Sequence, residues 1–296
     1  MIWTGANNLD VTVYGDGACL GGGTACHGND NIVVENGNAN IVVYGGYGND
    51  KITGGQTDDM QILMGDAGDD KIWLANPRNR NFETTGTYKA YGGTGKDNIY
   101  GTGQIDLIDG GSDGDYLRGY DGDDDIYGRA GDDVIHGDAG EDDLYGGSGN
   151  DKIYGGDDMD TIFGDDADGN LFGDDIIYGG GGADTISGGI GDDKIHGGDG
   201  IDTIMGGSGE DTIYGDAGND VIDSGSGWDT IFGGEGCDNI TTYDGGDVIW
   251  LGDCDGSSTQ KVSIYGTGED PENFTVIMDF WLAKPWNQIC IHESMH

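Results

Sequence analysis

The chain has 296 residues, of which 64 are glycine and 3 are proline, and its 57 acidic residues against 12 basic ones give a formal net charge of −45. Phosphate backbones and anionic membrane surfaces would repel so acidic a chain, which excludes nucleic acid and lipid headgroups and favours cations as partners. It contains no run of about 18 apolar residues, so no membrane-spanning helix and no membrane insertion are expected.

Residues 1–44 contain alternating runs, LDVTVY, NIVVE and NIVVY, that are typical of strands. We expect them to form an N-terminal β cap, because the open end of a stack of strands would recruit other chains. The first residues, MIWTGANNLDV, lack the basic and apolar regions of a cleavable signal peptide. We therefore expect that the chain leaves the cell by another route or is a piece of a longer protein.

Residues 45–91 contain two loose copies of a nine-residue phrase, GGYGNDKIT and GDAGDDKIW, and then an insertion at 74–91. The insertion carries Arg78, Arg80 and Lys89, three of the twelve basic residues. Two interpretations are open, a solvated bulge, which we favour, and a docking loop.

Residues 92–250 form the regular repeat, which divides into seventeen nonads with a six-residue acidic insertion, predicted to be a loop, at 164–169. In every nonad the sixth position is Asp and the eighth is Ile or Leu. Glycines permit positive φ, so GGxGxD is predicted to be a turn, and the last three residues to be a very short strand. Two nonads then form one coil of eighteen residues around a double column of Ile and Leu.

This phrase is similar to the calcium-binding nonapeptide G-G-x-G-x-D-x-U-x, and the chain resembles the RTX (repeats-in-toxin, hemolysin-type calcium-binding) family. The resemblance implies an all-β fold, a right-handed parallel β-roll (β-solenoid) with N- and C-terminal capping segments. It also implies that sixth-position aspartates one coil apart share Ca²⁺ with backbone oxygens of the turns. The implied pairs are Asp97–Asp115, Asp106–Asp124, Asp133–Asp151, Asp142–Asp160, Asp175–Asp193, Asp184–Asp202, Asp211–Asp229 and Asp220–Asp238.

Carboxylate and carbonyl oxygens are the ligands that Ca²⁺ prefers, whereas Mg²⁺ demands strict octahedral geometry. The aspartates could instead serve only as turn formers, but Asn or Ser would form a turn equally well and neither occupies the sixth position. Pairs two nonads apart number six before the insertion and seven after it, which gives roughly a dozen ions. The predicted metal ligands are Asp50, Asp70, Asp97, Asp106, Asp115, Asp124, Asp133, Asp142, Asp151, Asp160, Asp175, Asp184, Asp193, Asp202, Asp211, Asp220, Asp229, Asp238 and Asp247.

Some nonads depart from the consensus, and the sites near them are expected to differ. Non-glycine residues stand at the fourth position in Gln104, Asp113 and Asp158, and at the first position in Asn170, Ser224 and Thr242. In the 164–169 insertion, Asp165, Asp166 and Asp168 are candidates for an extra ion.

Five cysteines make an odd count, and none forms a CxxC pair. We expect one or two local disulfides and a free thiol. Cys19 and Cys26 are the favoured pair, because they lie in one loop-like segment.

Residues 251–296 leave the repeat and are predicted to form a C-terminal cap or an export-signal-like segment. The resemblance implies an uncleaved type I export signal there, although a segment rich in Trp, Cys and His does not match that pattern closely. The final HESMH fits the zinc-protease helix motif H-E-x-x-H, with His292 and His296 as ligands and Glu293 as base. No third ligand follows and the preceding ICI is strand-like, so we expect no enzyme.

The function expected from the sequence is that of a secreted calcium-binding β-roll that folds on extracellular Ca²⁺ and has a structural, scaffolding or adhesive role. Two alternatives are open, a non-catalytic module of a larger secreted enzyme or toxin and a self-assembling filament subunit. The expected partners are calcium ions, and beyond them another copy of the chain end to end or a cell-surface partner.

Overall fold

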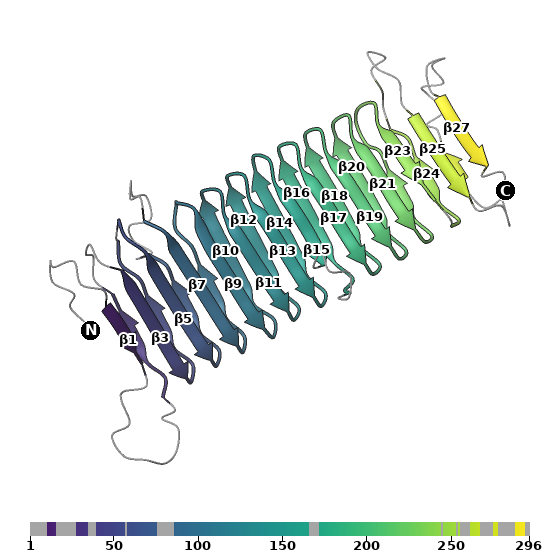
Figure 1. Ribbon diagram of the computed structural model, residues 1–296. Coiled ribbons are helices and arrows are strands. Elements are labelled where there is room, and N and C mark those ends of the chain that lie inside the picture. The colour runs from purple at the N-terminus through teal and green to yellow at the C-terminus, as the bar shows by residue number, and fades with distance from the viewer. Residues whose placement is uncertain are drawn as a thin grey trace. The chain divides into compact units, whose positions relative to one another are not determined.

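The computed structural model describes residues 11–15, 28–34, 40–56, 58–75, 86–165, 172–243, 245–252, 254, 261–266, 275–277 and 288–293. Two compact units divide the chain, Met1–Gly146 and Gly147–His296. Every regular element in the described ranges is a strand, and none of these residues forms a helix with the length and hydropathy to span a bilayer. Within each unit the strands form two sheets, which we call the odd sheet and the even sheet after the strand numbers (Figure 1).

The first unit contains parallel strands in both sheets. Its odd sheet has the order β1 (Val11–Tyr14), β3 (Ile41–Tyr47), β5 (Gln61–Ala67), β7 (Tyr88–Thr94), β9 (Asp106–Ser112) and β11 (Asp125–Ala130). Its even sheet has the order β2 (Asn31–Val33), β4 (Lys51–Thr53), β6 (Lys71–Trp73), β8 (Asn98–Tyr100), β10 (Tyr116–Asp121) and β12 (Val134–Ala139). Strand β13 (Asp143–Ser148) spans the boundary between the units.

The second unit repeats this arrangement, again with parallel strands. Its even sheet has the order β14 (Lys152–Asp157), β16 (Ile176–Gly181), β18 (Lys194–Asp199), β20 (Thr212–Ala217), β22 (Thr230–Phe232), β24 (Val248–Trp250) and β26 (Thr275–Ile277). Its odd sheet has the order β15 (Thr161–Asp165), β17 (Thr185–Ile190), β19 (Thr203–Ser208), β21 (Val221–Ser226), β23 (Asn239–Thr242), β25 (Lys261–Gly266) and β27 (Gln288–Glu293).

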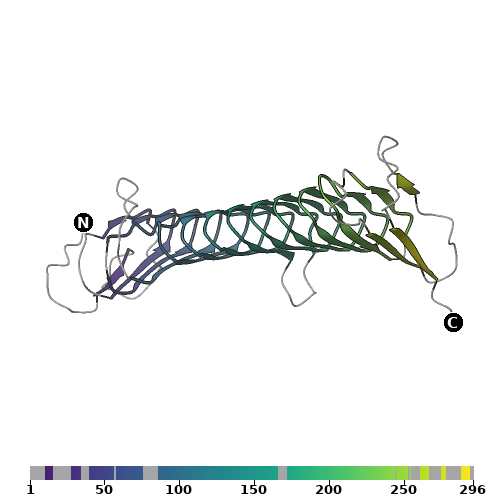
Figure 2. The same cartoon turned by 90° about the horizontal axis from the view of Figure 1, so that it is seen from above.

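Each coil consists of one strand of the odd sheet and one strand of the even sheet. The strands of successive coils pair in register (Figure 2). Ile195 of β18 lies opposite Ile213 of β20, so the eighth positions of the nonads stack in a column. These aliphatic side chains are fully buried, with relative exposures of 0% from Ile99 to Ile249. The structure confirms the predicted parallel β-solenoid, and the Ile and Leu columns form its core.

Most strands of the regular repeat are longer than the three residues predicted for each nonad, whereas β8, β22 and β24 have that length. Strand β14, for example, covers KIYGGD, so it includes the first three positions of the following nonad. Gly156 and Gly180 have φ of 140° and 116° and yet lie opposite each other in the β14–β16 pairing. The glycines therefore bend a strand whose ladder continues, and only the fourth to sixth positions form the turn.

The segments outside the regular repeat add strands to the same two sheets. In the first unit, β1 pairs with β3 and β2 pairs with β4. In the second, β25, β26 and β27 pair with β23, β24 and β25 respectively. The described residues of the 74–91 insertion differ in burial. Leu74 and Ala75 are buried, whereas Lys89 lies on the outward side of β7. Arg78 and Arg80 lie outside the described residues.

The outward face of the even sheet in the second unit carries a stack of ninth-position rings. Centroids of successive rings are 4.3 to 5.9 Å apart, and their planes are within 12° of parallel. The stacked residues are Tyr154, Tyr178, His196, Tyr214, Phe232 and Trp250. Stacking of this kind uses the coil spacing to bury ring faces that would otherwise contact water.

Candidate metal centre

The turns owe their shape to backbone torsions at the second and fourth positions. In the nonad that begins at Gly92, these are Gly93 and Gly95, with φ of 111° and 114°. Where another residue stands at either position it usually keeps the same sign, as in Tyr120 (88°) and Asp113 (75°). This left-handed geometry favours glycine because a Cβ makes it costly, and it explains the glycine pattern of the repeat.

The sixth-position aspartates are buried and joined in rows. The backbone N–H of one aspartate donates to Oδ1 of the aspartate one coil further on, at 2.6 to 3.1 Å. In the first unit the donor–acceptor pairs are Asp30–Asp50, Asp50–Asp70, Asp70–Asp97, Asp97–Asp115, Asp106–Asp124, Asp115–Asp133 and Asp124–Asp142. In the second they are Asp151–Asp175, Asp160–Asp184, Asp175–Asp193, Asp184–Asp202, Asp193–Asp211, Asp202–Asp220, Asp211–Asp229, Asp220–Asp238 and Asp229–Asp247.

The second carboxylate oxygen, Oδ2, is buried and has no hydrogen-bond partner within the described part of the chain in most of these turns. This holds for Asp70, Asp97, Asp115, Asp124, Asp175, Asp184, Asp193, Asp202, Asp211 and Asp220. A buried carboxylate oxygen with neither a donor nor a cation is strongly unfavourable.

Each Oδ2 lies over the first-position glycine of its own turn, in a space that we call the glycine cradle. A Cβ placed on Gly197 would be 2.5 Å from Oδ2 of Asp202 and 2.7 Å from the carbonyl oxygen of Gly215 in the next coil. The corresponding space over Gly206 brings together Oδ2 of Asp211 and the carbonyl oxygen of Ser224. Two acceptor oxygens therefore converge there without a proton donor between them.

Burial raises the pKa of these carboxyl groups, because the ionised form is unfavourable without a nearby positive charge. Desolvation raises the pKa of Asp97 to about 7 and that of Asp115 to about 8. At Asp124, desolvation and then the neighbouring Asp106 carboxylate raise the pKa to about 10. Near neutral pH, the turns of Asp97, Asp115 and Asp124 therefore favour a bound proton or a bound cation.

The donor set fits a hard divalent cation. Each cradle offers one carboxylate oxygen and one backbone carbonyl, the ligand types of Ca²⁺. Within the described ranges, no three Asp, Glu, His or Cys side chains lie close enough to hold an ion without backbone ligands. Carbonyl oxygens must therefore complete any site, as the glycine-rich turns allow.

One turn in the first unit is closed by its own side chains. Thr102 donates from its backbone N–H to Oδ2 of Asp106 at 2.6 Å, and its hydroxyl lies 3.1 Å from the same oxygen. Gln104, at the fourth position, is not among the non-glycine residues with positive φ. The altered turn gives Oδ2 of Asp106 two donors, so this oxygen has hydrogen-bond partners without a cation, although burial still raises the pKa of Asp106 to about 7.

Two turns of the second unit carry a hydroxyl in place of the first-position glycine. Ser224 and Thr242 are both fully buried. Burial raises the pKa of Asp229 and of Asp247, and these hydroxyl groups oppose the rise. The consensus cradle is thus filled by side-chain atoms at these two turns.

The described residues on either side of the acidic insertion correct the predicted frame. Gly164, and not Asn170, provides the first-position cradle for Asp175. As a result Asp151–Asp175 and Asp160–Asp184 are neighbours although 24 residues separate them, and an eighteen-residue spacing misses both pairs. Buried Asp165 accepts from the N–H of Ile190 at 2.6 Å, whereas Asp166 and Asp168 lie outside the described residues.

All nineteen aspartates predicted as ligands are buried at the sixth position of a turn. The structure also adds Asp30, whose phrase HGNDNI carries the same signal, to the first row. Six of the eight predicted pairs are hydrogen-bonded neighbours within a unit; Asp133–Asp151 and Asp142–Asp160 would join residues of different units and stay predictions. That these carboxylates bind calcium likewise stays a prediction.

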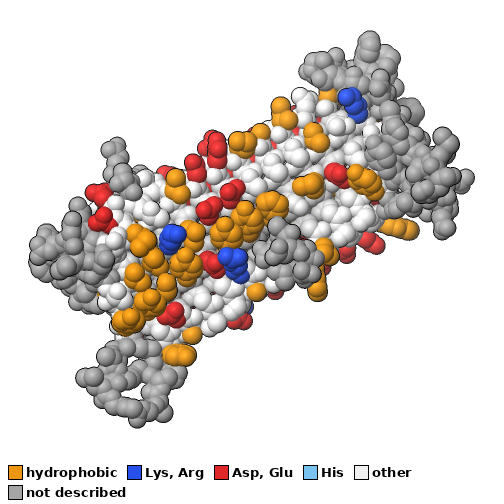
Figure 3. Space-filling model, viewed as in Figure 1, with side chains coloured by type: hydrophobic (Ala, Val, Ile, Leu, Met, Phe, Trp, Pro, Cys, Tyr) orange, Lys and Arg blue, Asp and Glu red, His pale blue; other side chains and the backbone are white. Residues whose placement is uncertain are grey.

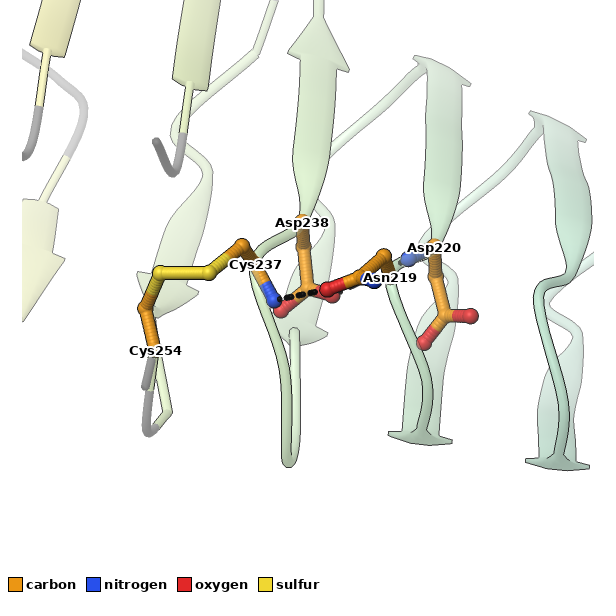
Figure 4. The surroundings of a disulfide bond; sticks show 5 residues. All are labelled: Asn219, Asp220, Cys237, Asp238 and Cys254. Atoms are coloured by element: carbon orange, nitrogen blue, oxygen red, sulfur yellow. Dashed lines mark hydrogen bonds between the residues drawn. A yellow bond between two sulfur atoms is a disulfide. The ribbon is translucent and has the colours of Figure 1, made fainter. Parts of the chain in front are cut away.

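A disulfide joins Cys237 to Cys254, with their Cα atoms 4.7 Å apart (Figure 4). Cys237 stands at the fifth position, directly before Asp238, and its N–H donates to Oδ1 of Asn219 at 2.8 Å. The expected pair of Cys19 and Cys26 lies outside the described residues, so that expectation is not tested.

The H-E-x-x-H match lies on a strand where the structure describes it. His292 and Glu293 belong to β27, whereas the protease motif requires a helix to bring its two histidines to one face. His296 lies outside the described residues.

A parallel β-solenoid with rows of buried aspartates in glycine-rich turns defines the class of calcium-binding repeat proteins. A comparison with protein-family models finds the RTX calcium-binding nonapeptide repeat over more than half of the chain, and the chain belongs to this family. The matched segments are 91–124, 109–144, 118–153, 136–171, 170–204, 196–227 and 223–253. No curated protein matches the chain.

Proposed function

We propose that this chain is a secreted, non-catalytic β-roll that folds when it meets extracellular Ca²⁺ and then serves as a structural or adhesive scaffold. The observation that carries the proposal is the glycine cradle, where a buried carboxylate oxygen faces a carbonyl oxygen with no donor between them. A bound Ca²⁺ supplies the positive charge that these oxygens lack. Roughly a dozen such ions would offset about half of the net charge of −45.

The turn that follows β18, together with β20 of the next coil, illustrates how the chain would hold an ion. Asp202 would contribute Oδ2 and Gly215 its carbonyl, while Oδ1 of Asp202 accepts the N–H of Asp184 at 2.9 Å. That hydrogen bond fixes the carboxylate so that Oδ2 stays in the cradle. Because the ligands come from successive coils, ion binding and coil stacking are the same event, and binding energy becomes folding energy.

One observation of this chain and one general property of calcium-binding modules support an extracellular setting. The Cys237–Cys254 disulfide is typical of proteins in oxidising compartments. Extracellular calcium modules operate with Kd values of about 10⁻⁴ to 10⁻³ M, so such sites are empty in the cytosol and filled outside the cell.

The test is far-UV circular dichroism during a calcium titration from a chelated sample to about 10 mM, which is about tenfold above the weakest Kd of about 10⁻³ M for extracellular modules. Magnesium is the control, because it keeps its waters and fits these sites poorly. A cooperative gain of β-signal with calcium alone is expected. Full β-structure under chelation would refute the proposal, and light scattering that rises with the β-signal would favour the filament role over the scaffold of single chains.

A further inference from the structure

Diagonal pairs of side chains cross the outward faces of the sheets. A ninth-position residue of one coil lies beside the second-position residue of the next coil, twenty residues on. In the first unit, Arg118 pairs with Asp138 and Arg129 pairs with Asp109 in this way, with N–O distances of 3.0 and 2.9 Å. In the second unit, His196 lies 3.0 Å from Asp216.

Both arginines also contact an aromatic ring of their own strand. The guanidinium carbon of Arg118 is 4.5 Å from the centroid of the Tyr120 ring, and that of Arg129 is 4.6 Å from the Tyr127 ring. A planar cation between a tyrosine face and an aspartate is therefore a recurrent local arrangement in this chain.

Asp66 of β5 stands where Asp138 stands in the Arg118–Asp138 pair, but no basic residue occupies the position of Arg118. It stands at the second position with φ of 74°, close to the 82° of Arg129. Since Gly46 lies opposite Asp66 in the β3–β5 pairing, the ninth-position residue on its diagonal is Tyr44. No Lys or Arg of the described ranges forms an ion pair with Asp66, whose carboxylate is exposed and accepts a backbone hydrogen bond from Gly46.

Beside Asp66 lies a recess that is lined by aromatic side chains. Its volume is about 560 Å³, within the range of small-ligand sites. The side chains of Tyr47, Met64 and Tyr91 line it together with Asp66, and neighbouring glycines of β3 and β7 contribute backbone. Figure 3 shows hydrophobic side chains gathered on this face at the end that carries β3, β5 and β7.

We propose that this recess binds an arginine or lysine side chain from a basic segment of another polypeptide. The incoming cation would make the same two kinds of contact that Arg118 and Arg129 make within this chain, with its charge at Asp66 and its apolar stem on Met64 and the tyrosine rings. Arginine suits the site better than lysine, because a planar guanidinium both stacks on a ring and pairs with a carboxylate.

The net charge of this chain favours a cationic partner, and it favours a polypeptide with several basic residues over a single small cation. The chain has a net charge of −45, which repels anionic partners and speeds the encounter with basic ones. One exposed cation–π contact changes affinity by only about two- to fivefold. A segment with repeated bases gains further attraction from the surrounding acidic surface, whereas a lone small cation does not.

The experiment uses the full chain at saturating calcium and a fluorescent peptide of alternating Arg and Ser, followed by anisotropy. The variants are Asp66→Asn, which keeps a residue tolerant of positive φ, and Tyr91→Leu, which keeps an apolar side chain. The matched controls are Asp199→Asn, an exposed acid of the second unit, and Tyr127→Leu, whose ring is already in contact with Arg129. We expect each test variant to weaken binding by about two- to fivefold, and the controls to leave it unchanged.

Four outcomes would overturn the proposal. Equal losses in Asp199→Asn and Asp66→Asn would mean unspecific attraction to an acidic surface. Competition by free arginine amide at the concentration of peptide arginines would mean a small-cation site. Equal binding of a peptide with Gln in place of Arg would mean apolar docking, and loss of self-association in Tyr91→Leu would mean that a second copy occupies the face.

Discussion

Filling a single glycine cradle tests whether the buried oxygens are ion ligands. Gly197 is buried and its φ is not positive, so alanine fits its backbone torsions without strain. The new Cβ of Gly197→Ala would enter the space between Oδ2 of Asp202 and the carbonyl of Gly215, at 2.5 and 2.7 Å. We therefore expect the variant to lose one ion and to leave the rest of the row in place.

The size of the effect follows from linkage. With a Kd of about 10⁻⁴ to 10⁻³ M, one site at about 10 mM free calcium contributes about 1.4 to 2.7 kcal/mol to the free energy of unfolding. Above the Kd this contribution grows by about 1.4 kcal/mol for each tenfold rise in free calcium. A steric clash alone would give a deficit that does not depend on calcium.

The assay is denaturant unfolding followed by far-UV circular dichroism at several buffered calcium concentrations, with equilibrium dialysis to count bound ions. Gly181→Ala is the matched control, because a Cβ there meets nothing within 4 Å and its φ is not positive. A deficit in Gly197→Ala that stays constant with calcium, or an equal deficit in Gly181→Ala, would refute the cradle as an ion site.

Three further predictions follow from the same turns. Burial raises the folded-state pKa of Asp97 from 3.8 to about 7, so the calcium-free folded chain binds more protons than the unfolded chain between those values, and its stability falls as the pH rises. Circular dichroism of the chelated chain should show more β-signal at about pH 4 than at pH 8, and the absence of any gain in acid would contradict this. Thr102→Val should cost about 1 to 3 kcal/mol by removing a donor from buried Asp106, and in denaturant unfolding this cost should not vary with calcium. Replacing Cys237 and Cys254 with serine should lower the free energy of unfolding by about 3 kcal/mol, given their sequence separation of 17, and an unchanged midpoint would exclude a stabilising role.

The periodic part of the fold could be predicted because each position of the nonad has one physical task. An aliphatic eighth residue has only the core to enter, as Ile195 and Ile213 show, and an aspartate after the turn glycines has only the turn interior. The strand length could not be predicted in the same way. Gly156 has a left-handed torsion that is typical of turns, but its partner Gly180 shares it, so the pairing between coils continues.

The effect of a departure from the consensus could not be predicted from the sequence, because one substitution keeps the positive φ of the glycine it replaces and another does not. Asp113 and Asp158 replace the fourth-position glycine and keep its positive φ, whereas Gln104 does not. The frame at the insertion was ambiguous, since a loop can enter on either side of the leading glycines. The cradle resolves it, because Gly164 is the residue that faces the Asp175 carboxylate and the carbonyl oxygen of Gly188 in the next coil.

The turns of the last coils of the second unit differ from the consensus cradle. In one row of turns, the last aspartate of the described residues is Asp238. Lys261 lies opposite Asn239 in the next coil, and the residue before Lys261 in the sequence is Gln260, which has no carboxylate. The Cys237–Cys254 disulfide ties the turn of Asp238 to the following turn (Figure 4). In the other row, Ser224 and Thr242 occupy the cradles.

The disulfide stays in place when calcium is removed, so the calcium dependence of the second unit should be graded along its sheets. At limiting calcium, amide hydrogen exchange should be fast in β16 and β18, which are followed by consensus turns at Asp184 and Asp202, and slower in β22 and β24. Uniform exchange across these strands would show that the solenoid responds to calcium as one cooperative body, and that the substitutions near its last regular coils do not make them independent of the ion.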